Sequence, residues 1–337
     1  MDQTCYREGV RLTDAYDLIR LPDDERKAVI EDTFDLLGIH GMFVEKDLWV
    51  TVLLKFLFEE SLFRDSLLFK GGTCLSKCYS AINRFSEDVD LLLDWRVLGY
   101  PFDGPEVQPT RKKQDRSNRS LVNAVSRYVR DVATPVVRDG LSRILGVPLD
   151  VCSEGSDVVV NCPSLYVGSY VRNRVLLEIG CRGRWKDVEV RSVGPLVFDV
   201  FPELSSDFVS VKAIPLDAAY CEKIAILHSV AVSGKVNDRY SRHYFDVYEL
   251  FRRFHPVVSD GSLAEIVEFN RRMYPGSRYG YDTLAVGTLK LVPSRETVEL
   301  LKSDYARMAD MIYVEAPSFD EILLLLADIE REINGNR

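Results

Sequence analysis

One stretch of the chain, residues 67–94, constrains the fold most, because its pattern changes from apolar run to helix to strand within a few residues. Two glycines, Gly71 and Gly72, interrupt the apolar run. Thr73 then suits the cap position of a helix of about three turns that ends near residue 83. From Asp88 the apolar residues recur with a period of two, which is typical of a strand. The stretch therefore predicts strand, glycine turn, helix and second strand.

The second strand carries two aspartates on one face. Asp88 and Asp90 alternate with Val89 and Leu91, so both carboxylates lie on the same side of the predicted sheet. Residues two apart on a strand are separated by about 7 Å, and buried carboxylates at that distance repel each other. A divalent cation between them removes the penalty, so the pair predicts a Mg²⁺ site. Asp94 shares this face but lies about 13 Å beyond Asp90 along the strand.

A third carboxylate, Glu178, interrupts an apolar stretch that we expect to form a strand over residues 165–180. An unpaired buried carboxylate costs several kcal/mol, so Glu178 taken alone is better explained by an edge strand or an ion pair. Beside Asp88 and Asp90 it becomes a candidate metal ligand. Three carboxylates can hold two Mg²⁺ ions about 4 Å apart, one activating an attacking oxygen and one holding a triphosphate.

The glycine turn suits phosphate binding. Backbone N–H groups of Gly71 and Gly72, at the start of a helix, can approach an anion closely. Thr73 adds a hydroxyl and Lys77, one turn later, adds a positive charge. We expect these four residues to bind the phosphates of an NTP during nucleotidyl transfer, in which pyrophosphate leaves. The spacing does not match a Walker P-loop, and the motifs of protein kinases and Ser-His-Asp hydrolases are missing from the sequence.

The charge distribution and the cysteine content limit the class of protein to which this chain can belong. The net charge is −9, but residues 111–143 contain nine Lys or Arg against three Asp. This stretch is either a solvated helix face or part of a groove for phosphates. No apolar run reaches the length of a membrane span, and the seven cysteines form no Cys-x-x-Cys pair, which fits a reducing cytoplasm.

Two further patterns are noted along the chain. Residues 188–201 are expected to form another strand of the sheet. Arg242 and Asp246 stand four residues apart in a predicted helix, a spacing that suits a surface ion pair.

Five motifs taken together resemble one known family. They are Val44-Glu45-Lys46-Asp47-Leu48-Trp49-Val50, Lys70-Gly71-Gly72-Thr73 with Arg84-Phe85-Ser86-Glu87-Asp88-Val89-Asp90, Leu177-Glu178-Ile179, Glu222-Lys223-Ile224-Ala225, and Arg242-His243-Tyr244-Phe245-Asp246-Val247-Tyr248. The set is similar to that of the AbiEii/AbiGii toxin family, which are nucleotidyltransferase-like toxins of abortive-infection (type IV) toxin–antitoxin systems. The resemblance spans about residues 44–250, and its first aspartate block is the most specific part.

The resemblance implies an α+β fold with a DNA polymerase β-like nucleotidyltransferase core, a mixed sheet flanked by helices, and a helical C-terminal region. Residues 1–210 would form the nucleotidyltransferase domain, with N-terminal helices and a helical insertion near 99–150. Residues 211–337 would form a helical domain that completes the active site.

The resemblance also implies roles for four residues. Asp88 and Asp90 would be metal ligands, and Lys223 would contact the NTP phosphates. Asp246 would be an active-site acid whose part in the chemistry, including that of a base, stays open.

We therefore expect a cytoplasmic, Mg²⁺-dependent toxin that transfers NMP from an NTP to RNA. The favoured acceptor is the 3′ end of tRNA, which would block translation and growth, and a cognate protein antitoxin would neutralise the toxin. Two alternatives stay open. One is the same chemistry on a protein hydroxyl or a small molecule, and the other is a non-catalytic module that binds a nucleotide or a partner.

Overall fold

The computed structural model describes residues 14–86, 88–101, 104–166, 173–181, 183, 185, 188–202, 207–273 and 279–335. The chain divides into two compact units. The first comprises Met1–Cys78, Glu87–Phe102 and Asn123–Ala213, and the second comprises Tyr79–Ser86, Asp103–Val122 and Ile214–Arg337. The second unit thus takes in two segments that precede residue 211 in the sequence.

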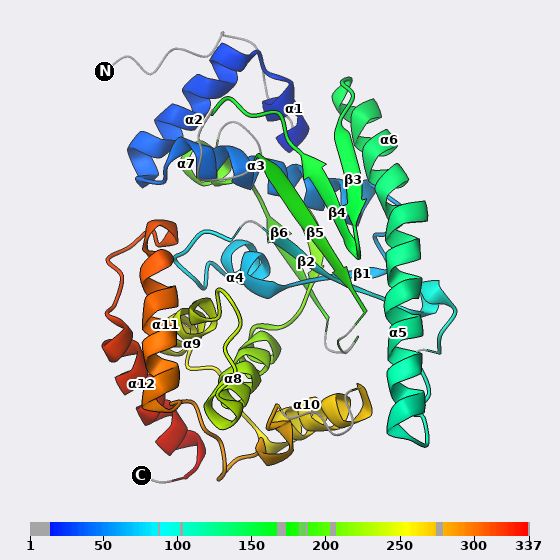
Figure 1. Ribbon diagram of the computed structural model, residues 1–337. Helices are drawn as coiled ribbons and strands as arrows, with labels where there is room; N and C mark the ends of the chain where they lie inside the picture. Colours follow the sequence, from blue (N-terminus) through cyan, green and yellow to red (C-terminus); the bar gives the residue numbers. More distant parts are fainter. Residues whose placement is uncertain are drawn as a thin grey trace. The chain divides into compact units, whose positions relative to one another are not determined.

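The first unit is built on a mixed sheet (Figure 1). Its strands are β1 (Leu67–Lys70), β2 (Asp88–Leu93), β3 (Asp150–Glu154), β4 (Asp157–Asn161), β5 (Arg174–Gly180), β6 (Glu189–Val193) and β7 (Val209–Ala213). They are ordered β3-β4-β5-β2-β1-β7-β6. β2 runs parallel to β5, and β1 runs parallel to β7, whereas the other neighbours are antiparallel. The predicted α+β class with a mixed sheet is confirmed.

The first unit also contains helices. They are α1 (Ala15–Arg20), α2 (Asp23–Leu37), α3 (Gly41–Lys55), α4 (Gly71–Tyr79), α6 (Thr134–Leu145) and α7 (Leu196–Val200), with single turns at Phe56–Glu60, Trp95–Leu98 and Val129–Ala133. Helix α5 (Arg111–Tyr128) begins in the second unit and ends in the first. Nearly every residue of α3 is buried, because this helix packs against β5 and β7 and also against α1, α2 and α7. Residues 48–54 of this helix are apolar apart from Thr51, as expected of a helical segment that is covered on all sides.

Several sequence-based boundaries were wrong. Helix α4 ends at Tyr79 rather than near residue 83, and the strand expected over 165–180 is β5, which extends from Arg174 to Gly180. Helix α4 begins at Gly71, so both glycines and Thr73 belong to its first turn rather than preceding it. The expected strand over 188–201 ends at Val193, and Pro195 precedes the short helix α7. Pro195 has no N–H to donate to a strand ladder, whereas its fixed φ suits a helix start.

The second unit is helical. Its C-terminal helices are α8 (Leu216–Ser233), α9 (Ser241–Phe254), α10 (Asp260–Met273), α11 (Arg295–Arg307) and α12 (Phe319–Ile333), with short turns at Tyr281–Thr283 and Ala309–Met311. Helix α9 contacts α8, α11 and α12 (Figure 1). Tyr305 and Phe319 pack against each other in its core, with ring centroids 5.4 Å apart and ring planes tilted by 47°. The predicted helical C-terminal region is therefore present.

In the part of the chain that the structure describes, no helix combines the length and the apolar character needed to span a membrane.

Candidate active site

The two aspartates of the opening stretch lie on β2 as predicted. Asp88 and Asp90 are partly exposed, whereas Val89 and Leu91, which alternate with them, are buried. The strand therefore presents both carboxylates on one face and its apolar side chains on the other. Asp94 follows β2 and is engaged elsewhere, because its carboxylate accepts hydrogen bonds from the Arg96 side chain, one of them at 2.8 Å from Nε to Oδ2.

Glu178 lies beside this pair. In the parallel pairing of β2 with β5, Asp90 is directly opposite Glu178, and Asp88 is opposite Leu176. Neighbouring strands are about 4.8 Å apart, so Asp90 and Glu178 are close enough to share one cation. The structure thus places the three carboxylates that the sequence singled out on two adjacent strands.

Asp90 and Glu178 belong to a row of paired positions that runs across neighbouring strands of the sheet. This carboxylate row contains two more residues, which the sequence did not single out as site residues. On β4, Asp157 is opposite Glu178, and on β1, Lys70 is opposite Asp90. Burial raises the pKa of Asp157, and the negative charges of Glu154 and Asp90 raise it further. A local pattern could not have identified Asp157, because only the strand register places it in the row.

The donor types in this row suit a hard divalent cation, since Mg²⁺ prefers carboxylate oxygens. Among the described residues, however, no group of three or more His, Cys, Asp or Glu side chains converges closely enough to hold a metal ion. The row therefore supplies suitable ligands on adjacent strands without forming a closed cage.

The glycine turn packs directly against the row. Gly71 has a φ of +75°, and a Cβ at this position would overlap the Asp90 carboxylate. Only glycine satisfies both demands, because it tolerates positive φ and leaves room for the carboxylate. The turn therefore brings the first N–H groups of α4 next to the predicted metal ligands, where an anionic phosphate would be bound.

Thr73 does not cap α4. Its side chain is buried, and its Oγ1 donates a hydrogen bond of 2.5 Å to the Asp88 carbonyl oxygen. Gly72 is buried beside it. The hydroxyl therefore ties the first turn of α4 to the start of β2, which holds the glycine turn and the aspartates together.

Lys77 forms an ion pair inside the first unit. Its Nζ lies 2.5 Å from Asp47 Oδ1, and its side chain is 6% exposed. Asp47 belongs to α3 and also accepts a hydrogen bond from the Leu196 backbone N–H at 2.7 Å. The ammonium group of Lys77 therefore connects α4 to the buried helix α3 and, through Asp47, to α7.

A second cluster lies in the second unit, around Asp246 of α9. The Asp246 carboxylate is fully buried and accepts two hydrogen bonds from Arg84, from Nε at 2.7 Å and from Nη2 at 2.8 Å. It accepts a third, at 2.7 Å, from Nζ of Lys223 on α8. Two predicted site residues, Lys223 and Asp246, are thus in direct contact. Arg242, which the spacing suggested as a partner of Asp246, does not pair with it.

Backbone pairing explains how Arg84 reaches this cluster. Arg84 forms an isolated β-bridge with Ile312. On either side of it, the N–H of Phe85 donates to Met311 at 2.7 Å, and the N–H of Tyr313 donates to Asn83 at 2.9 Å. Arg84 was missed as a site residue, although it stands in the aspartate motif, because its partner is remote in the sequence.

The charges of this cluster are strongly coupled. Burial alone would raise the pKa of Asp246, but Arg84 and Lys223 outweigh it and hold the pKa well below its usual range. Burial lowers the pKa of Lys223, which must share its one carboxylate with Arg84. Asp246 therefore stays ionised and has little tendency to take up a proton.

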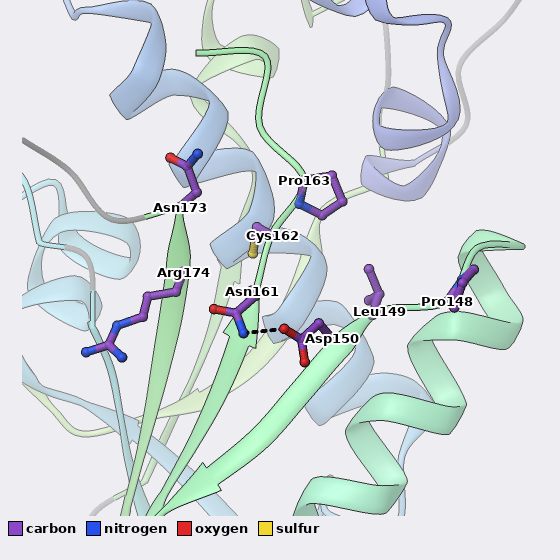
Figure 2. A pocket seen from close by; sticks show the side chains of 8 residues that line it. All are labelled: Pro148, Leu149, Asp150, Asn161, Cys162, Pro163, Asn173 and Arg174. Carbon is purple, nitrogen blue, oxygen red and sulfur yellow. Dashed lines mark hydrogen bonds between the residues drawn. The ribbon is translucent and has the colours of Figure 1, made fainter. Parts of the chain in front are cut away.

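An open hollow lies elsewhere, at the end of the sheet where β5 begins (Figure 2). Asn161 donates a hydrogen bond of 2.8 Å to Asp150 across its floor. Arg174 is the single cation among its lining residues. Because Glu178 is near the other end of β5, this hollow is not part of the carboxylate row.

Comparison with known proteins gives the class and then the family. A family model described as "Nucleotidyl transferase AbiEii toxin, Type IV TA system" matches residues 55–324, which is more than half of the chain. The protein is therefore a nucleotidyltransferase of the toxin class. It belongs to the AbiEii toxin family of type IV toxin–antitoxin systems, as its sequence motifs indicated.

Solved structures to which the chain is similar include JHP933 from Helicobacter pylori, with 13% identity and a TM-score of 0.45 over 88% of this chain and 94% of that one. MenT4, the nucleotidyltransferase toxin Rv2826c from Mycobacterium tuberculosis H37Rv, shows 15% identity and a TM-score of 0.45 over 94% of this chain and 99% of that one. No curated protein matches the sequence.

Proposed function

We propose that this toxin transfers NMP from an NTP to an RNA acceptor in the presence of Mg²⁺, that the acceptor is the 3′ end of tRNA, and that the modification blocks translation and growth. The observation that carries this proposal is the register of Asp90 opposite Glu178, with Gly71 packed on Asp90. This arrangement places ligands for a cation beside a helix start that can bind phosphate. Nucleotidyl transfer requires both features at one site.

Each candidate site residue of the first unit has a role in this proposal. Asp88, Asp90 and Glu178 hold Mg²⁺, which when bound supplies Lewis-acid assistance to the attacking oxygen and to the triphosphate. Gly71 and Gly72 present backbone N–H groups to the phosphates. Thr73 keeps this turn next to β2 through its bond to the Asp88 carbonyl.

The cluster of the second unit serves the same reaction in this proposal. Lys223 contacts the NTP phosphates as a cation. Asp246 acts as a positioning residue for Lys223 and Arg84, because its oxygens accept three hydrogen bonds and its pKa is low. A carboxylate with so low a pKa is a weak general base.

Lys77 is a candidate phosphate ligand whose ammonium group is bound to Asp47 in this structure. We propose that its ion pair with Asp47 stabilises the packing of α4 and that Lys77 does not itself contact the phosphates. This role and direct contact with an NTP make opposite predictions for the KM of Lys77→Met.

A basic surface supports RNA as the acceptor. Five cations in the first half of α5 are exposed: Arg111, Lys112, Lys113, Arg116 and Arg119. Farther along the same stretch, Arg130 and Arg138 pair with the neighbouring Asp131 and Asp139, so their charges are largely compensated. A second stretch, residues 172–191, contains six basic and three acidic residues, and part of it lies outside the described residues. An exposed run of cations is the electrostatic footprint of nucleic-acid binding.

The family assignment also supports a protein antitoxin as partner. We propose that a cognate antitoxin prevents turnover, and an incorporation assay with and without that antitoxin would measure the effect directly.

An incorporation assay tests the function. The protein is incubated with Mg²⁺, total tRNA and each labelled NTP in turn, and the modified 3′ ends are sequenced. Asp88→Asn should abolish incorporation and growth inhibition, because it removes one charged ligand. Asp139→Asn, at an exposed ion pair, is the matched control and should retain both.

The outcomes separate the candidates. Label in protein or in a small molecule would keep the chemistry and reject RNA as acceptor. Growth inhibition that survives Asp88→Asn would show that toxicity does not depend on this carboxylate site.

A further inference from the structure

A second polar site lies within the helical unit, at the start of α9 and the end of α11. It is a cavity of about 100 Å³ whose wall contains four arginines and two aspartates. The lining residues are Arg84, Asp238, Arg239, Ser241, Arg242, Asp304, Arg307, Met308 and Met311. Because a water molecule occupies about 30 Å³ in the liquid, the cavity has room for a compact anion.

The two aspartates of the wall are already engaged. Asp304 accepts hydrogen bonds from the backbone N–H and the Oγ of Ser241 at 2.9 and 2.6 Å, and from the Arg239 N–H at 3.1 Å. Arg307 pairs with both Asp304, at 2.9 Å, and Asp238, at 3.2 Å. The negative charge of the wall is therefore balanced by partners within it.

Arg242 has no such partner. Its side chain lines the cavity and is partly buried, yet no hydrogen bond or ion pair joins it to another residue in the described part of the chain. Its positive charge contributes to lowering the pKa values of Lys223 and His243, after the larger effect of burial. An uncompensated guanidinium in the wall of a cavity favours an anion there, and the planar fork of Arg suits phosphate oxygens.

The cavity is connected to the Asp246 cluster through one side chain. Arg84 lines the cavity and also donates two hydrogen bonds to Asp246, which binds Lys223. Anion binding in the cavity would therefore act through Arg84 on Asp246, the residue that binds Lys223.

We propose that this cavity binds one phosphate group, with Arg242 as its principal donor and Arg307 as a second. The phosphate comes either from the backbone of the RNA acceptor or from the polyphosphate of a nucleotide. The inference deepens the proposed function, since it adds a phosphate subsite to the same protein, but it concerns binding and can be measured without turnover.

The test measures binding to the full chain without Mg²⁺ or NTP. One probe is a fluorescent single-stranded RNA oligonucleotide with a 5′-hydroxyl, which carries only backbone phosphates, and the other is pyrophosphate. Arg242→Gln is the decisive variant, because this side chain has no partner in the fold to lose, and its Tm should match that of the wild type. Arg253→Gln, an exposed arginine at the other end of α9, is the control.

Loss of one phosphate contact should weaken affinity about tenfold, and for a single strand it should reduce the slope of log K against log salt by about 0.7. If these changes appear with RNA alone, the phosphate is that of the acceptor backbone. If they appear with pyrophosphate, it is that of the nucleotide. If Arg242→Gln binds both probes as tightly as Arg253→Gln does, the inference is overturned, whether or not the protein proves active in the incorporation assay.

Discussion

Arg84 and Asp246 form a two-pronged ion pair across 162 residues of sequence, with both side chains almost completely buried. Arg84 comes from the segment that precedes β2, and Asp246 comes from α9. Lys223 adds a second cation to the same carboxylate. This relationship links the motif that contains Arg84 to the motifs that contain Lys223 and Asp246, and it lies entirely within the second unit.

Removing the arginine should be costly. Arg84→Gln leaves a buried carboxylate with only one cation, and breaking a buried pair in this way costs about 3 kcal/mol in free energy of unfolding. Urea titration measures the loss. Arg138→Gln removes an exposed pair and should change stability by less than about 1 kcal/mol. Equal stability losses in the two variants would show that Asp246 does not depend on Arg84.

His243 predicts a pH dependence. Burial lowers its pKa well below 6.5, helped by the charges of Lys223 and Arg242. Its Nδ1 is buried and has no hydrogen-bond partner among the described residues. Because the folded-state pKa lies below the unfolded value, the unfolded chain takes up a proton first as the pH falls through 6.5. His243 should therefore reduce stability below that pH by up to about 1.4 kcal/mol per pH unit.

His243→Gln should remove this part of the slope of unfolding free energy against pH. His255→Asn, at an exposed left-handed helix end that asparagine tolerates, is the control and should keep the slope. Identical slopes in wild type and His243→Gln would contradict the prediction.

Gly71→Ala should damage both stability and activity. Positive φ costs an alanine about 1 kcal/mol, and its Cβ would displace the Asp90 carboxylate. Gly155 has a φ of +65° with open space around it, so Gly155→Ala should show the strain alone. We expect nucleotide incorporation to be lost in the first variant and kept in the second. Normal incorporation by Gly71→Ala would mean that the turn does not position Asp90.

Lys77→Met separates anchoring from phosphate binding. If Lys77 acts through Asp47, the variant should lose about 2 kcal/mol of stability, since a partly buried carboxylate loses its cation, while the KM for NTP stays within about twofold. Steady-state incorporation kinetics and chemical denaturation give the two values. A KM raised tenfold without a matching loss of stability would assign Lys77 to the phosphates instead.

Much of the candidate site could be predicted because it is encoded locally. The period of two from Asp88 placed both aspartates on one strand face, and the interruption of an apolar strand marked Glu178. The motifs around Lys223 and Asp246 indicated a family that the whole-chain comparison confirmed.

Other features could not be predicted in this way. Thr73 was expected to cap α4, but the helix begins at Gly71, and the hydroxyl bonds the Asp88 carbonyl instead. Asp246 was expected to pair with Arg242 one turn away, but burial of α9 directs it to Arg84 and Lys223. Helical spacing indicates which side chains can meet on the exposed surface of a helix. It does not indicate which partner a buried side chain contacts.

The alternation of β2, the glycine at the turn and the family are apparent from the amino-acid sequence, since each depends on residues near one another or on motif identity. The pairing of Asp157 with Glu178, the binding of Lys77 to Asp47 and the contact of Arg84 with Asp246 became apparent in the folded chain. Strand register and long-range ion pairs follow from how the whole chain buries its apolar surface, and no local pattern records the outcome.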